Sequence, residues 1–198
     1  MHYKNYQHAR DTSWKILLDC KADRLPVDVL QVCKQLGIRV ISYEDGKLII
    51  ERYKMQRVTA RTDGFTLVVY DRPIIFVDMT RSRARIRFTI AHELGHIVLD
   101  HVEWNRPTIV NREPGPHDNP QETAANQFAA RLLAPACVLW ALDLHTPEDI
   151  ARVCDISLPA AQFRAQRMEV LYRRQKFLTS PLERAVYEQF RPFICPEG

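Results

Sequence analysis

The feature that most constrains this chain is a short polar motif inside an apolar segment, His92-Glu93-Leu94-Gly95-His96. On a helix, residues at positions i and i+4 lie about 40° apart, so both imidazoles can approach one ion. Two histidines at this spacing suit a tetrahedral Zn²⁺. Glu93, next to the first histidine, is placed to act as general base toward a water activated by the metal.

The expected helix around this motif, over about residues 82–100, is apolar on every side. Its apolar residues are Phe88, Ile90, Ala91, Leu94, Ile97, Val98 and Leu99. A helix that is apolar all round is buried, and buried histidine and glutamate side chains are costly unless they are paired or bind a metal. The alternative is two core histidines with satisfied hydrogen bonds and a glutamate on the helix surface. The buried context favours the metal.

A catalytic zinc usually has three protein ligands and one open position. The candidates for the third ligand follow the motif and are His101, Glu103, His117, Asp118 and Glu122. Glu122 fits best, because it continues the apolar stripe of the next expected helix, residues 120–134, toward the core. Glu122 also fits the third position of a helix that Asn119 caps and Pro120 begins. The two interpretations are compatible.

Hydrophobic periodicity predicts an α+β chain with N-terminal helices, a small mixed sheet and a helical C-terminal part. We expect helices over residues 9–20 and from Pro26 to Leu36, where Gly37 ends the second helix. Strands are expected at residues 38–43, 65–70 and 74–79, whereas residues 47–55 fit either a strand or a helix. Because Pro73 precedes it, the strand 74–79 is predicted to lie at the sheet edge.

The C-terminal part suggests a separate helical unit, so we predict one domain over residues 1–143 and a second segment over residues 144–198. Residues 146–171 resemble a helix-turn-helix, with Ala151 in the first helix and Phe163 packing from the second. The arginines that could contact phosphate are Arg164, Arg167, Arg173 and Arg174. A packing unit that completes the fold is the favoured interpretation.

A run of alternating arginines precedes the motif, and its members are Arg81, Arg83, Arg85 and Arg87. It is either a basic patch that binds an acidic partner or, as we favour, a solvated segment end.

Composition excludes several classes of protein. The five cysteines form no C-x-x-C pair, which argues against a disulfide framework and a cysteine zinc site. No apolar run reaches the roughly 18 residues of a membrane span, and the N-terminus lacks a signal-peptide core. The net charge of +4 permits an acidic partner without requiring one. We therefore expect a soluble, cytoplasmic protein.

Two segments resemble the ImmA/IrrE family of metallo-endopeptidases. Residues 87–96 look like that family's zinc helix, and residues 122–135 are similar to its E-x-x-A-N-x-F-A-x-x-L-L-x-P signature. Residues 25–28 with 36–38 look like its entry segment, and the overall resemblance runs from about residue 9 to 170. The departure is Ala134, at a position often filled by Met, which affects packing and leaves the site intact.

The resemblance implies a zincin-like peptidase domain in which His92, His96 and Glu122 bind Zn²⁺, or Mn²⁺ in its place, and Glu93 is the catalytic base. Family members typically belong to bacterial or phage-related regulatory systems. Their described substrates are helix-turn-helix repressors, cleaved to relieve repression, so such a repressor is the expected partner. His101 and His117 remain candidates for a role in transition-state stabilisation.

In such a site a peptide could add to the sheet edge, which would make Ile74, Phe76 and Asp78 substrate-binding residues. The alternative function is a DNA-binding transcriptional regulator with a structural or vestigial metal site. A structural zinc would normally be closed by a fourth protein ligand, and no cysteine lies close in the sequence to supply one. A vestigial site would often lack the base, whereas Glu93 is present. Both considerations favour the enzyme over DNA binding.

Overall fold

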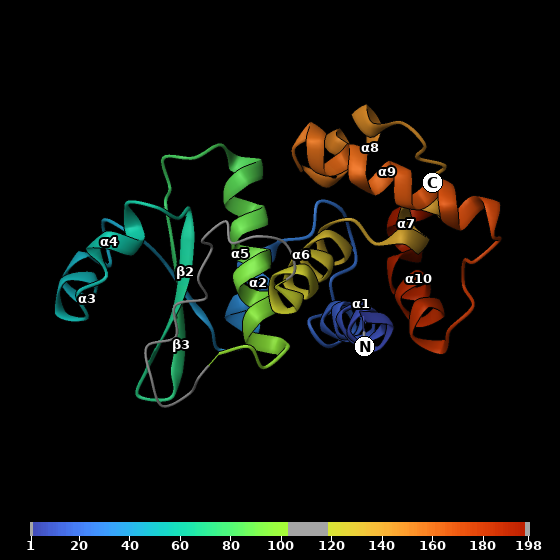
Figure 1. Ribbon diagram of the computed structural model, residues 1–198. Helices are drawn as coiled ribbons and strands as arrows, with labels where there is room; N and C mark the ends of the chain where they lie inside the picture. Colours follow the sequence, from blue (N-terminus) through green and yellow to red (C-terminus); the bar gives the residue numbers. More distant parts are fainter. Residues whose placement is uncertain (1, 103–118, 197–198) are drawn as a thin grey trace.

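The computed structural model describes residues 2–102 and 119–196, with a small sheet between two short helices and a larger group of helices (Figure 1). The strands are β1 (Arg39–Ser42), β2 (Gly64–Val69) and β3 (Arg72–Val77). Their order is β1-β3-β2, with β1 parallel and β2 antiparallel to β3. The predicted α+β class with a small mixed sheet is therefore confirmed.

Local residues determine where the first two helices begin and end. Helix α1 (His2–Asp19) begins earlier than expected. Helix α2 (Val29–Gln35) is capped by Asp28, whose carboxylate accepts a hydrogen bond from the Gln31 amide. Pro26 therefore precedes this helix, whereas we expected it in the first turn. Gly37, at φ +71°, ends the helix as predicted.

Residues 47–55 contain a helix, α3 (Lys47–Arg52), and α4 (Gln56–Thr59) follows it. These two short helices lead from β1 to β2.

The prediction that the strand 74–79 lies at the sheet edge is wrong, because β3 is the central strand. Pairing with β1 starts at Ile74, so Pro73 lies outside that ladder, where a missing N–H is tolerated. Ile74 and Phe76 are buried, and the Phe76 ring stacks on Phe65 with centroids 4.8 Å apart. Asp78 follows the strand and pairs with Arg81 at 2.9 Å. Ile74, Phe76 and Asp78 therefore do not form a sheet edge to which a peptide could add.

Helix α5 (Arg83–Val98), which carries the motif, lies between the sheet and α6 (Pro120–Leu133), and α1 packs on α6 (Figure 1). A close approach of α5 and α6 explains Gly95. A Cβ there would lie 3.0 Å from the Phe128 ring and 3.3 Å from the Ala125 backbone. The motif is thus held in the middle of the core.

The C-terminal part consists of α7 (Ala136–Ala141), α8 (Pro147–Cys154), α9 (Leu158–Arg173) and α10 (Pro181–Ile194). Phe163 is 75% exposed, so the prediction that it packs inside the α8–α9 pair is wrong. The buried face of α9 instead follows helical spacing through Ala161, Arg164 and Met168. The predicted domain boundary falls between α7 and α8 and stays a prediction.

The alternating arginines before the motif pair with acidic residues of this same chain. Arg81 and Arg85 pair with Asp63, beside the sheet. Arg83 and Arg87 pair with Asp155, which ends α8 in the left-handed conformation. The run therefore joins the start of α5 to the residue before β2 and to the end of α8. None of the described helices has the length and apolar character of a membrane span.

Candidate metal centre

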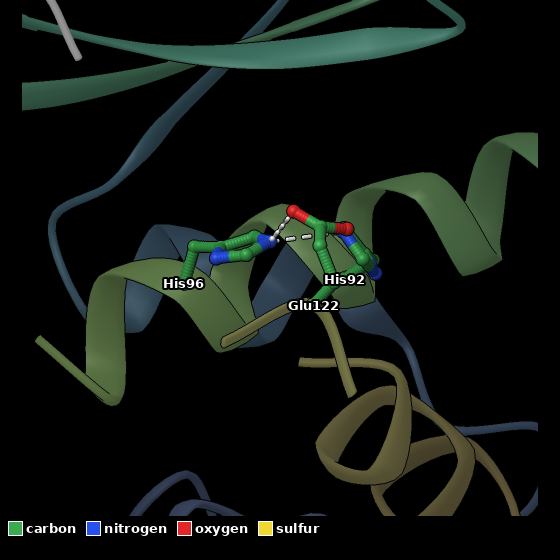
Figure 2. Close-up of side chains that lie close together, drawn as sticks. All are labelled: His92, His96 and Glu122. Carbon is green, nitrogen blue, oxygen red and sulfur yellow. Dashed lines mark hydrogen bonds and ion pairs between the residues drawn. The ribbon is translucent and has the colours of Figure 1, made fainter. Parts of the chain in front are cut away.

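The side chains of the motif are buried in α5. His92, Glu93 and His96 are 2%, 1% and 0% exposed. Glu122 reaches the two imidazoles from the first turn of α6 (Figure 2). The Asn119 side chain caps this turn and accepts a hydrogen bond from the Gln121 amide at 3.0 Å. The interpretation of this segment as a capped helix start is therefore confirmed.

The ligand atoms of three side chains converge at one place. The Nε2 atoms of His92 and His96 lie 3.0 Å apart, and they lie 3.3 and 3.2 Å from the two carboxylate oxygens of Glu122. Ligands at about 2.0 Å from a tetrahedral ion are separated from one another by about 3.3 Å. The three side chains could therefore hold one metal ion, and their ligand atoms all lie within 4.8 Å of one another.

The electrostatics of the cluster also fit a cation. Oε1 of Glu122 is buried and, despite its proximity to His96, has no hydrogen bond among the described residues. Burial raises the pKa of Glu122, but the adjacent His92 and His96 outweigh it and hold the pKa below its usual range. An ionised carboxylate with an unsatisfied oxygen beside two imidazole nitrogens is a site that a divalent cation would complete.

The outer nitrogens of both imidazoles have partners. Nδ1 of His92 lies 2.8 Å from the amide oxygen of Asn126, and Nδ1 of His96 lies 3.1 Å from Nδ1 of His101. Burial, together with His96, lowers the pKa of His101 to about 4, so at neutral pH the unprotonated Nδ1 of His101 can accept a hydrogen bond from Nδ1–H of His96. Acceptors at Nδ1 favour the tautomer in which each Nε2 would offer a lone pair to an ion in the shared site.

These contacts separate the candidates for the third ligand. Glu122 lies with the two histidines, whereas His101 lies behind His96. Glu103, His117 and Asp118 lie outside the described residues. Asn126 belongs to the second sequence signature, but the sequence alone gave it no role.

Glu93 has a partner on the sheet that sequence analysis missed. The hydroxyl of Thr66, on β2, donates a hydrogen bond of 2.9 Å to Oε2 of Glu93, and Thr66 is itself buried. The available signal was one threonine inside an otherwise apolar strand. Because β2 is an edge strand among those described, this contact connects Glu93 to an edge of the sheet.

Comparison with known proteins agrees with this arrangement. Residues 33–173 match the family model Peptidase_M78, described as the IrrE N-terminal-like domain. The match spans more than two thirds of the chain and includes His92, Glu93, His96, Glu122 and Thr66. No curated protein matches the chain.

Proposed function

Since this chain belongs to the Peptidase_M78 family of IrrE N-terminal-like metallopeptidases, we propose that it is a zinc-dependent endopeptidase that cleaves a helix-turn-helix repressor and so relieves repression. The observation that carries the proposal is the convergence of His92, His96 and Glu122, with Glu93 adjacent to the first of them. Two imidazoles and one carboxylate are a donor set typical of catalytic zinc, with a further position left for water.

Glu93 has the central role in the proposed reaction. When bound, the ion would supply a Lewis acid that makes water a nucleophile near neutral pH and polarises the peptide carbonyl. The Glu93 carboxylate takes the proton of the attacking water and transfers it to the nitrogen of the leaving amine as the C–N bond breaks. Thr66 holds one oxygen of that carboxylate in place.

Replacing Thr66 tests this positioning. We expect Thr66→Val to slow cleavage by about tenfold, because a lost hydrogen bond to a carboxylate is worth about 1.5 kcal/mol. Thr66→Ser keeps the hydroxyl and should retain most of the wild-type rate. Metal content, measured by mass spectrometry of the elements, should be the same in all three proteins. Equal rates for the valine and serine variants would contradict the positioning role.

The substrate proposal rests on the edge of the sheet and on the family. A peptide that added as a strand along β2 would pass beside Thr66 and Glu93. The first substrate to test is a helix-turn-helix repressor encoded beside the gene. We expect cleavage of that repressor at one site and little cleavage of casein, measured by intact-mass spectrometry. Rapid, unselective cleavage of casein would contradict a repressor-specific enzyme.

The alternative of a DNA-binding regulator gains no support from the α8–α9 pair. Arg164 is buried and its Nε donates a hydrogen bond of 2.7 Å to the Ala134 carbonyl. Arg167 donates to the Tyr6 hydroxyl. Two of the four arginines expected to contact phosphate on DNA are therefore directed into the protein.

A further inference from the structure

Cationic side chains surround one cavity that lies apart from the metal cluster. The cavity has a volume of about 240 Å³ and is lined by residues of α1, α6, α7 and α9, of the segment that leads into α10, and of the first turn of α10. The cationic residues in its wall are Arg10, Arg131, Arg164, Arg167, Arg174 and Lys176. Such a concentration of positive charge is unfavourable unless an anion balances it.

The two most buried of these arginines have no acidic partner. Arg131 and Arg164 are only 8% and 6% exposed. Each donates a hydrogen bond of 2.7 Å to a backbone carbonyl, that of Gln127 and that of Ala134 respectively. Among residues 6–102 and 119–196, no carboxylate forms an ion pair with Arg131 or Arg164. A buried guanidinium without an anion carries a large desolvation cost.

Carboxylates balance only part of the positive charge of the cavity. Asp11 pairs with Arg10 at 2.8 Å. Glu183 is the one carboxylate in the wall itself, and its Oε2 accepts a hydrogen bond of 3.0 Å from the Thr179 amide. Burial raises the pKa of Glu183. The Tyr6 ring lies 4.4 Å from the guanidinium of Arg131 and 5.2 Å from that of Arg167. Tyr6 thus holds two cations side by side without a carboxylate.

We propose that this cavity binds a small molecule that carries a phosphate group. Guanidinium groups form paired hydrogen bonds to phosphate oxygens, and several guanidiniums around one cavity can share a single phosphate. The volume is below the roughly 300 Å³ at which pockets for drug-sized ligands begin, so the ligand is small. Free phosphate, pyrophosphate and a small phosphate monoester share the required chemistry.

Calorimetry with the whole 198-residue chain tests the site. The probes are inorganic phosphate, pyrophosphate and adenosine monophosphate, each titrated at constant ionic strength, with sodium chloride as the reference. We expect saturable binding of one molecule per chain. Binding of the inorganic ions would identify free phosphate as sufficient, and binding of the nucleotide alone would assign the ligand to the organic phosphates. Absence of saturable binding by all three probes at millimolar concentrations would overturn the proposal.

Substitutions locate the binding to the cavity. We expect Arg167→Gln and Arg174→Gln each to weaken binding by about tenfold or more, because each removes a charged donor to phosphate. Arg174 is exposed, so Arg174→Gln preserves the test if Arg167→Gln fails to fold. Arg173→Gln is the matched control, since it removes the same charge from an adjacent residue outside the cavity. An equal loss in Arg173→Gln would overturn the proposal, and none of these outcomes depends on peptidase activity.

Discussion

The Glu93→Gln variant is expected to keep its metal and to lose peptide cleavage, with kcat falling by about 10³-fold. Glutamine has nearly the same shape and can still contact Thr66, but its amide cannot take a proton from water. Since Glu93 is not among the three side chains whose donor atoms converge, the metal affinity should be unchanged. Initial rates of repressor cleavage, measured together with metal content, give both quantities for the same sample.

Glu51→Gln is the matched control for this variant. Glu51 is an exposed residue of α3, and its substitution makes the same chemical change away from the motif. It should cleave at the wild-type rate. Cleavage by Glu93→Gln within a few-fold of wild type would show that another group is the base.

Glu122→Ala is expected to lower metal affinity by more than about 100-fold, because a direct ligand contributes more than the outer partners whose loss costs 10–100-fold. It removes the one carboxylate of the cluster and leaves the two Nε2 atoms, 3.0 Å apart, as its remaining ligand atoms. Cleavage should be lost with the metal. A competition titration with a zinc chelator measures the affinity.

Gln121→Ala controls for an effect on the helix start. Gln121 is exposed and belongs to the same capped turn, and its backbone N–H keeps the bond to Asn119 after substitution. Wild-type affinity is expected for Gln121→Ala. Equal affinity in Glu122→Ala and wild type would exclude this carboxylate as a ligand.

The parts of the site predicted from sequence depend on neighbouring residues. The spacing of His92 and His96 places both on one helix face whatever the rest of the fold. Likewise Asn119 and Pro120 set the start of α6, and the apolar stripe that follows directs Glu122 inward. Local chemistry of this kind is readable in a sequence because capping and helical periodicity act over only a few residues.

The features that were missed depend on contacts between distant residues. Strand order depends on the pairing of β1 with β3, which lies beyond two short helices and β2, so Pro73 misled the edge prediction. Thr66 resembles any strand threonine until the fold brings it to Glu93, 27 residues later. The orientation of Phe163 was missed because the helical face that α9 buries is set by its neighbours. Periodicity shows that a face exists but does not show which residues cover it.

The most direct test of the proposed centre is anomalous diffraction at the zinc absorption edge from a crystal of the zinc-loaded protein. The expected result is one strong anomalous peak per chain, within bonding distance of Nε2 of His92, Nε2 of His96 and the carboxylate of Glu122. A peak bound elsewhere, with the Glu122 carboxylate turned away from both imidazoles, would contradict the centre and the hydrolytic mechanism built on it.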